Sequence, residues 1–196
     1  MPSRESKSDR FLDAARQEFI DHGISRVGVA EIARRAGVSR QTLYRTCGDK
    51  DAIVSAVVAR EVLGFVSTFA KDIAVLPTPQ ERLIEAFVVG MRECRNNPIV
   101  NALRHFDLDF LVAQLLDSDN DGRRSARMAM AMLVAGGDIP FETAERIVEF
   151  AVRVTATLLV SPTALLPTDT DTGSREFAQN YLAAAVTSVL SSSLQD

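Results

Sequence analysis

Apolar residues along most of the chain recur every three or four positions, which is the period of an amphipathic α-helix. Near the N-terminus this pattern is carried by Phe11, Ala14, Ala15, Phe19 and Ile20. Strand-like alternation of apolar and polar residues is absent, and no internal repeat of about 20–50 residues occurs. The sequence therefore predicts an all-α fold.

Glycine, proline and N-capping residues divide this pattern into about nine helices. The first is expected to end at Gly23, and two short helices follow over Val29–Ala36 and Arg40–Arg45. Asp49 can cap a long fourth helix that reaches about Val75. The later helices are predicted to begin at Pro79, at Pro98, after the acidic run 117–122, at Asp138–Pro140 and near Ser174.

Charge is distributed unevenly along the chain. Residues 1–60 hold 11 basic and 8 acidic residues, a net charge of +3, whereas residues 61–196 hold 11 basic and 18 acidic residues, a net charge of −7. A basic N-terminal segment before an acidic one indicates two modules with different partners. We therefore predict a head at residues 1–50 and a body at residues 51–196.

The composition is that of a globular protein, with 46% hydrophobic and 24% charged residues. This excludes disordered, collagen-like and disulfide-scaffold proteins. Cys47 and Cys94 are the only cysteines, and no CxxC pair occurs, so reduced thiols are expected. The polar N-terminus predicts no secretion signal, and the longest uncharged stretch, 177–195, is too polar for a membrane span. These features predict a soluble, cytoplasmic protein.

Residues 28–50 predict a helix-turn-helix, in which two short helices are joined by the turn Gly37-Val38-Ser39. Ala33 is small where the two helices must cross closely, and Val38 can fill the space between them. Ser39 can cap the second of these helices, whose N-terminal side chains would enter a DNA major groove.

On these residues the chain resembles the tetracycline-repressor (TetR) family of bacterial regulators. The resemblance rests on Ile32-Ala33-Arg34-Arg35-Ala36-Gly37-Val38-Ser39, on Thr42-Leu43-Tyr44 and on Lys50, and it extends from about Arg10 to Ile53. In that family this motif implies a three-helix DNA-binding head. The remaining helices of the family bind an inducer and form a dimer.

The resemblance implies that the recognition helix presents Arg40, Gln41, Thr42 and Tyr44, and that Lys50 contacts a phosphate. Guanidinium and amide groups can pair bidentately with guanine and adenine. Further candidate DNA contacts beside the motif are Arg34, Ser39, Arg45 and Thr46. Arg34 and its neighbour Arg35 could instead be a solvated helix face, and Gln41 a surface residue.

Four positions depart from the pattern of the family. Gly28 stands where a capping threonine is usual, Gln41 replaces a frequent glycine, and Thr46-Cys47 replace a common His-Phe pair. We interpret these differences as an altered choice of operator and a slightly looser head.

The sequence predicts no enzyme, metal site or cofactor. It contains no HExxH, GxSxG, P-loop or GxGxxG motif. Asp117, Asp119, Asp121 and Gly122 match the start of a calcium loop, but Met128 stands where the bidentate glutamate is required. An acidic linker is the better interpretation.

The predicted body carries aromatic and methionine pairs four residues apart, a spacing typical of a helical core. By resemblance to the family, the same residues could line a pocket for an apolar or amphipathic ligand, with methionine giving adaptability. The candidate ligand-binding residues are Phe65, Phe69, Phe87, Met91, Phe106, Phe110, Met128 and Met132.

The last two predicted helices are apolar and rich in small residues. In the TetR family these helices pair with their copies across a dimer interface, although a face inside one subunit is the alternative. The candidate interface residues are Ile147, Ala151, Thr155, Leu158, Phe177, Tyr181, Ala184, Ala185 and Ser188.

Together these features predict a homodimeric transcriptional repressor that a small apolar or amphipathic inducer releases from a palindromic, double-stranded DNA operator. Two alternatives remain at the level of sequence. One is a regulator with a collapsed pocket that answers to a protein partner or to nothing. The other is an all-α binding module with an accessory basic head.

Overall fold

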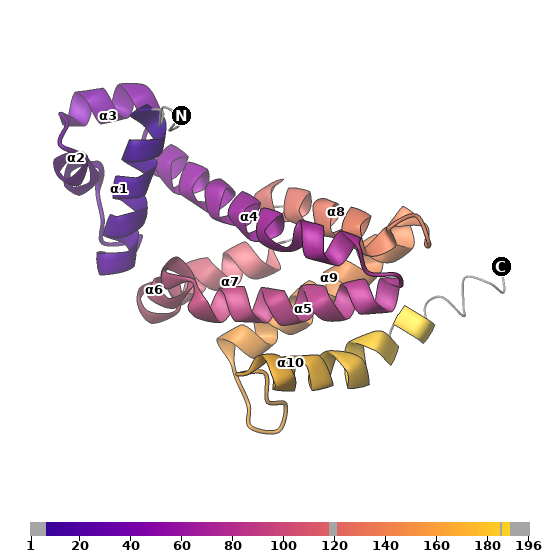
Figure 1. Ribbon diagram of the computed structural model, residues 1–196. Coiled ribbons are helices and arrows are strands. Elements are labelled where there is room, and N and C mark those ends of the chain that lie inside the picture. The colour runs from indigo at the N-terminus through magenta and orange to yellow at the C-terminus, as the bar shows by residue number, and fades with distance from the viewer. Residues whose placement is uncertain (1–6, 118–120, 185, 189–196) are drawn as a thin grey trace. The chain divides into compact units, whose positions relative to one another are not determined.

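The computed structural model describes residues 7–117, 121–184 and 186–188, apart from the side chains of Phe69, Asp121 and Gly122, and every regular element in these ranges is a helix (Figure 1). The all-α prediction is therefore confirmed. The helices are α1 (Lys7–His22), α2 (Val29–Ala36), α3 (Arg40–Cys47), α4 (Lys50–Ala74), α5 (Pro79–Asn96), α6 (Pro98–Phe106), α7 (Leu108–Leu116), α8 (Asp121–Ala135), α9 (Phe141–Val160) and α10 (Asp171–Phe177). A π-helical turn, Ala178–Leu182, follows α10 directly.

Backbone contacts divide the chain into two compact units, and the division falls inside helices. The first unit comprises the chain up to Glu61 together with Asn97–Leu111, and the second comprises Val62–Asn96 and the chain from Val112 onward. The units therefore do not follow the predicted boundary at residue 50. The first unit extends further because α6 packs against α1, which the sequence separates by more than 70 residues.

The core of the first unit joins α1, α2, α3 and the beginning of α4 (Figure 1). Each of these helices turns an apolar stripe inward, and burying a large apolar side chain contributes roughly 1.5–3 kcal/mol. The large side chains that are fully buried here are Phe19, Val27, Ile32, Leu43, Ile53 and Val57. This core fixes the positions of the two short helices.

Polar side chains begin several helices, as the sequence predicted. The Ala52 N–H donates to Asp49 Oδ1 at 2.9 Å, and the Ile99 N–H donates to Asn97 Oδ1 at 2.9 Å. Thr78 and Glu81 exchange hydrogen bonds, because each side chain accepts from the backbone N–H of the other residue. Each cap satisfies N–H groups that have no partner inside the helix.

The helix predicted to begin at Pro98 is broken, which the sequence pattern did not indicate. Asp107 interrupts it with a backbone at φ −140° and ψ 52°, so that α6 ends at Phe106 and α7 begins at Leu108. The Asp107 carboxylate accepts hydrogen bonds from backbone N–H groups of Ile24 and Ser25, far away in sequence. A long-range interaction therefore overrides the local helical pattern.

α4 is long and apolar enough to cross a membrane by length and composition alone, with a hydropathy of 1.6 over its most apolar window. Its midpoint nevertheless carries two charged residues, and both are paired with α1. Arg60 lies 2.7 Å from Asp13, and Arg16 Nε donates to Glu61 Oε1 at 2.7 Å. These ion pairs belong to the packed first unit, so we interpret α4 as a helix of a globular fold.

Glu61 is the point where α1, α4 and the start of α6 meet. Burial alone would raise its pKa, but the hydrogen bonds that Arg16 and Asn97 donate bring the pKa below its ordinary value of 4.5. The ionised carboxylate is therefore the form that the folded unit stabilises. This contribution is present above the ordinary pKa and is lost as the pH falls through the lowered value.

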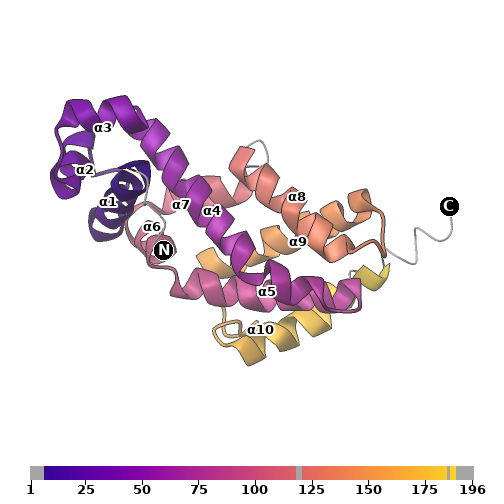
Figure 2. The ribbon, with the colours of Figure 1, turned by 45° about the horizontal axis from the view of Figure 1, so that its top comes forward.

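The second unit is a bundle in which α5, α8, α9 and α10 pack against one another (Figure 2). Its core holds Leu83, Ala131, Ala144 and Val148. The buried Arg82 guanidinium donates to the carbonyl oxygens of Leu76 and Val134 and pairs with Asp138, so it fixes the α4–α5 loop to the end of α8. The other core residues of this cluster are Phe87, Met91, Val134, Ala135, Ile147, Ala151, Leu158, Leu159, Phe177, Ala178, Leu182 and Val186.

The last helix begins earlier than predicted and then widens. Thr170 caps α10 by accepting from the Gly173 N–H at 3.1 Å, and Asp171 pairs with Arg92 and Arg95 of α5. The π-helical turn 178–182 follows, where the sequence pattern predicted an ordinary helix. Such single π-helical turns are rare and frequently lie at functional sites.

Candidate nucleic-acid interface

The N-terminus of α3 is fixed by the side chains of Ser39 and Thr42. Ser39 Oγ accepts from the Thr42 N–H at 3.2 Å, and the two hydroxyl oxygens lie 2.9 Å apart. The preceding turn depends on Gly37, whose φ of +69° lies in the left-handed region, where residues with a Cβ are strained. This confirms the capping role that the sequence predicted for Ser39.

α3 buries one side and exposes the other. Leu43 is completely buried, whereas Arg40, Gln41 and Arg45 are exposed and 60% of Tyr44 is accessible. Tyr44 therefore projects from the head rather than packing its ring inside. The exposed side carries guanidinium, amide and phenol groups, which can reach both base edges and phosphates.

Thr46 and Cys47 end the helix. The Thr46 hydroxyl donates to the Thr42 carbonyl oxygen at 2.9 Å, so its proton is used within α3 and its oxygen stays exposed as an acceptor. A hydroxyl in this state has no proton to donate to a phosphate. Cys47 is half-buried. The predicted DNA contact of Thr46 stays a prediction.

Lys50 begins α4 and lies near the α1–α2 turn. Its Nζ donates to the Ser25 carbonyl oxygen at 3.3 Å. An ammonium group has three donors, so two remain for an anion.

The neighbouring arginines of α2 have different environments. Arg34 is exposed, whereas Arg35 donates to the buried Glu18 at 2.7 Å and to Asp21 at 2.5 Å. The hydrogen bond to Glu18 raises the pKa of Arg35 above its ordinary value. Arg35 is thus part of the packing of α2 on α1, and of the two arginines only Arg34 is available for a phosphate.

Gly28 at the start of α2 lacks a capping hydroxyl, and Glu31 compensates for it. The Gly28 N–H donates to Glu31 Oε2 at 3.1 Å. Hydrogen bonds from the backbone N–H groups of Glu31 and Gly28 hold the pKa of the Glu31 carboxyl below its ordinary value. The Glu31 carboxylate therefore holds the start of α2, so the missing hydroxyl at Gly28 loosens the head less than the sequence suggested.

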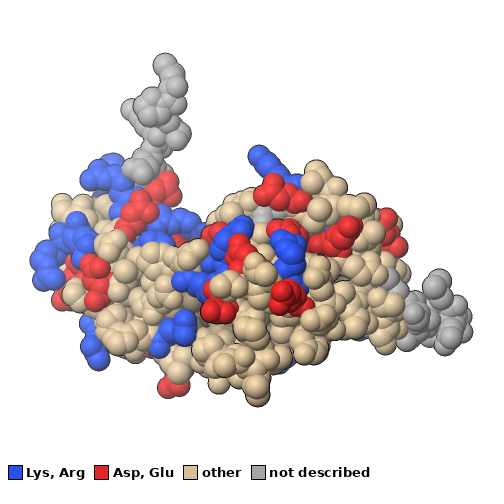
Figure 3. Space-filling model, turned by 60° about the horizontal axis from the view of Figure 1, so that its bottom comes forward, with Lys and Arg blue, Asp and Glu red and all other residues tan. Residues whose placement is uncertain are grey.

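Basic side chains gather over the unit that contains α1–α3, at the left of Figure 3, with acidic side chains among them, and charges of both signs also mix over the rest of that face. This pattern follows the excess of basic residues within positions 1–60. A local excess of positive charge attracts the phosphates of a nucleic acid even when the whole protein is acidic.

The side chains of seven of the eight predicted ligand-binding residues are described, and their role in holding a ligand stays a prediction. Phe87 and Met91 are packed in the core of the second unit, and Phe65 packs against the neighbouring cluster of Ile73, Ala86 and Val89. Met128 and Met132 are largely exposed. Phe106 and Phe110 belong to the first unit, where Phe106 lies against Arg26. The side chain of Phe69 lies outside the described residues.

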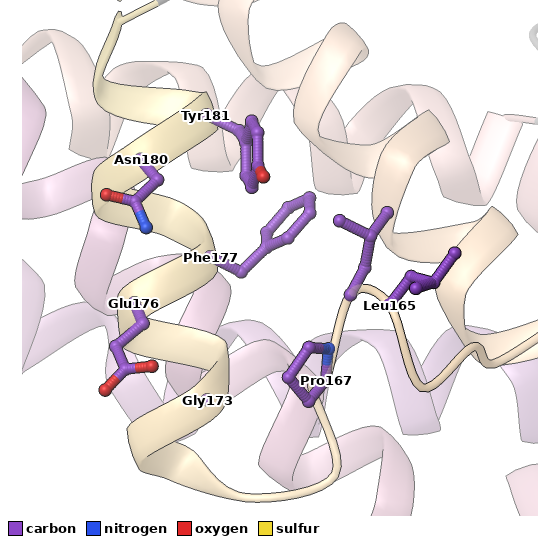
Figure 4. Close-up of a pocket in the computed structure, with 8 residues that line it drawn as sticks. Leu165, Pro167, Gly173, Glu176, Phe177, Asn180 and Tyr181 are labelled. Carbon is purple, nitrogen blue, oxygen red and sulfur yellow. The ribbon is translucent and has the colours of Figure 1, made fainter.

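A pocket of about 170 Å³ lies between the α9–α10 loop and the last helix (Figure 4). The rings of Phe177 and Tyr181 face Leu165 and Pro167 across it, while Asn180 and Glu176 lie along another edge of the helix. Pockets for small ligands usually enclose about 300–1,000 Å³. This pocket is therefore too small and open to hold a ligand of ordinary size by itself.

Four of the predicted interface residues are buried within their own chain. Ile147, Ala151, Leu158 and Phe177 belong to the core of the second unit, because α9 and α10 turn these side chains toward α5 and α8. Packing thus gives these four an interior role in the chain, and the interface as a whole stays a prediction. Thr155 is half-buried, Tyr181, Ala184 and Ser188 are exposed, and Ala185 lies outside the described residues.

Sequence reasoning did not identify the contribution of Asp107 and Ser25 to this surface. Asp107 holds the α1–α2 turn from α6, and Ser25 holds Lys50. No local pattern indicates this, since an aspartate at a helix end is ordinary. Only the packing of α6 on α1 brings these residues together.

The different roles of Arg34 and Arg35 lead to a matched prediction. Arg35→Ala leaves the buried Glu18 carboxylate without its guanidinium and should lower the unfolding free energy by about 1–3 kcal/mol, whereas exposed Arg34→Ala should change it by less than about 0.5 kcal/mol. Urea unfolding followed by circular dichroism at 222 nm checks this in a chain without tryptophan. Equal stability of the two variants would contradict the assigned role of Arg35.

Comparisons with known proteins identify the family of this chain. Residues 11–57 match the family model of bacterial regulatory proteins of the tetR family. A helix-turn-helix transcriptional regulator of Mycobacterium tuberculosis is 32% identical over 161 residues, which cover 81% of this chain and 77% of the relative. The helix-turn-helix transcriptional activator FasR of Mycolicibacterium smegmatis is 34% identical over 87 residues, covering 43% of this chain and 40% of FasR.

A solved structure shows the same fold. The TetR-family repressor AlkX from Dietzia superposes with a TM-score of 0.69 at 20% identity, and the alignment covers 95% of this chain and 98% of AlkX. The matched residues include the complete helix-turn-helix, and the named relatives are transcriptional regulators rather than enzymes. The chain therefore belongs to the TetR family and is a DNA-binding transcriptional regulator.

Proposed function

We propose that the chain is a homodimeric repressor, which binds a palindromic operator in the bacterial cytoplasm and is released by a small apolar or amphipathic molecule. The observation that carries the DNA-binding part is the exposed side of α3, where Arg40, Gln41 and Tyr44 face outward around the buried Leu43. An amphipathic helix held by one side and polar on the other suits insertion into a major groove.

In this proposal the residues divide between base recognition and phosphate binding. Arg40 and Gln41 at the N-terminal end of α3 read base edges, with guanine and adenine as the bidentate partners. Thr42 lies beside them at the N-terminal end of α3, which enters the groove, and is proposed to contact DNA there. Arg34, Arg45 and Lys50 neutralise phosphates, and the Tyr44 hydroxyl donates to one. The α3 N-terminus itself favours an adjacent phosphate, because its free N–H groups carry partial positive charge.

A homodimer would place two such heads on successive major grooves, about 34–36 Å apart or a near multiple of that distance. Exposed apolar side chains on the second unit support a partner surface: half of Phe150 on α9 is accessible, and more than half of Tyr181. Large exposed apolar side chains are favourable where a second copy covers them. We propose these residues with Ala184 and Ser188 in place of the four interior ones.

Release from DNA requires a ligand that binds the DNA-incompetent arrangement more tightly, since equal affinity for both arrangements shifts nothing. The core of the second unit offers flexible methionine beside aromatic rings, with Met91 and Met130 among its apolar side chains. A small apolar or amphipathic molecule would enter by displacing such side chains.

A second candidate function has an observation in its favour. Phe87 and Met91 are buried in the core of the second unit, among the other apolar side chains of its cluster. This favours a regulator whose pocket is collapsed, and which answers to a protein partner or to no small molecule. The two candidates share the DNA-binding head and differ in the body.

The base-reading role of α3 predicts different effects for two classes of variant. Arg40→Ala and Gln41→Ala should lower the preference for the DNA upstream of the gene over a shuffled duplex, whereas Lys50→Met should weaken both duplexes by a similar factor. Fluorescence anisotropy at two salt concentrations measures these affinities. If both α3 variants keep the preference of the parent protein for the upstream DNA, Arg40 and Gln41 do not read its bases. If the parent protein itself shows no such preference, the upstream DNA does not contain its operator.

The proposed dimer predicts that Phe150→Glu combined with Tyr181→Glu shifts the protein toward monomers, because a buried charge at the interface is costly. Val75→Glu is the matched control, since Val75 is an exposed apolar residue of the α4–α5 loop. Sedimentation velocity over a range of protein concentrations reports the oligomeric state. A dimer that persists unchanged in the double variant would place the interface elsewhere.

The two candidates for the body make opposite predictions with dodecanoate as an amphipathic probe. A ligand-responsive body should show a melting temperature that rises with dodecanoate concentration and saturates, together with weaker operator binding. Acetate provides the control with the same carboxylate and no alkyl chain. Dodecanoate that changes neither the melting temperature nor operator affinity would instead support the collapsed pocket.

A further inference from the structure

The α1–α2 turn is held from outside by the corner between α6 and α7. Asp107 Oδ2 accepts from the Ile24 N–H at 2.7 Å, and Oδ1 accepts from the Ser25 N–H at 3.1 Å. Both carboxylate oxygens are therefore used by two successive backbone donors. These N–H groups follow the end of α1, where the chain turns and no helical partner is available.

The same corner fits closely against the turn on either side of these hydrogen bonds. At Gly23, where φ is +85°, an added Cβ would lie 2.7 Å from Asp107 Oδ2 and 2.7 Å from Phe106 Cβ. The Arg26 guanidinium lies 5.6 Å from the centre of the Phe106 ring, within the range of a cation–π interaction. The turn is thus enclosed by Phe106 and Asp107.

Ser25 also contacts the phosphate-binding lysine. Its carbonyl oxygen accepts from Lys50 Nζ at 3.3 Å, while its N–H donates to Asp107. One residue therefore joins the α6–α7 corner to the first residue of α4. A lysine side chain has several freely rotating bonds, so a fixed acceptor reduces the entropy that it loses on binding a phosphate.

From this arrangement we propose that Asp107 is a positioning residue for DNA binding, which acts through Ser25 to hold the Lys50 ammonium where it meets a phosphate. The inference rests on the proposed phosphate contact of Lys50. Asp107 itself, as an anion, repels DNA. Its removal should therefore tighten binding if charge alone mattered, and weaken binding if it positions Lys50.

The test compares Asp107→Asn with Asp109→Asn in the full-length protein. Asp109 lies two residues further on and is exposed at the start of α7. Its replacement therefore makes the same change in charge but leaves the hydrogen bonds of Asp107 to the α1–α2 turn intact. Binding is measured by fluorescence anisotropy on a shuffled 30-base-pair duplex over a series of salt concentrations. A shuffled sequence makes the result independent of whether an operator is known.

Asp107→Asn should weaken this binding about 3–10-fold and reduce the slope of log affinity against log salt by the amount expected for about one phosphate contact. Asp109→Asn should leave binding unchanged or slightly tighter. In a Lys50→Met background, Asp107→Asn should have less than a twofold further effect, because both residues act on one contact. Equal weakening in both backgrounds, or no weakening beyond Asp109→Asn, would overturn the proposal. A Lys50→Met variant that binds this duplex as tightly as the parent protein would instead contradict the proposed phosphate contact of Lys50.

A second measurement does not need DNA. The chain has only three lysines, Lys7, Lys50 and Lys71, so their reductively methylated ammonium groups can be resolved by NMR. Asp107→Asn should shift and narrow the Lys50 signal and leave that of Lys71 in place. An unchanged Lys50 signal would overturn the proposal. If the Asp107→Asn variant melts below the assay temperature, the Asp107→Glu variant is used in its place. DNA binding of that variant is then compared with and without Lys50→Met, and the same outcomes decide the proposal.

Discussion

The DNA-binding surface depends on the burial of one side chain, Leu43, in the core formed by α1 and α2. It is the one residue of α3 that is buried, and the exposed residues Arg40, Gln41, Tyr44 and Arg45 carry the polar chemistry. The contact fixes the rotation of the helix, and the hydrogen bond from Thr42 to Ser39 fixes its N-terminus. Together they determine which side chains project outward. A rigid, preorganised helix end can approach a groove without losing further conformational entropy.

The basic residues of the head serve two purposes, and their surroundings distinguish them. Arg16 and Arg35 are hydrogen-bonded to Glu61 and Glu18, and they hold helices together. Arg34, Arg40 and Arg45 are exposed. Lys50 combines both roles, because one of its N–H donors is bonded to the Ser25 carbonyl oxygen and two remain available for an anion. Counting charges along the sequence therefore overstates the number of arginines that can meet DNA.

The second unit gives less support for a bound ligand than the first unit gives for DNA binding. Packing in the second unit uses Phe87 and Met91, two of the residues that periodicity identified, and the pocket beside Phe177 and Tyr181 is small. Core residues and pocket-lining residues obey the same spacing on a helix, so periodicity cannot distinguish them. A ligand site in such a core would depend on the arrangement of several helices. The residue at any single position does not reveal that arrangement.

The sequence by itself determined the all-α fold, the helix-turn-helix and most helix starts, because period, glycine turns and N-caps are local properties of a few neighbouring residues. It identified Ser39 and Asp49 as caps for this reason. Tertiary structure alone decided that Arg35 pairs with Glu18, that Phe177 is interior, and that Asp107 breaks a helix to hold the α1–α2 turn. Each of these depends on residues distant in sequence, whose proximity follows from packing.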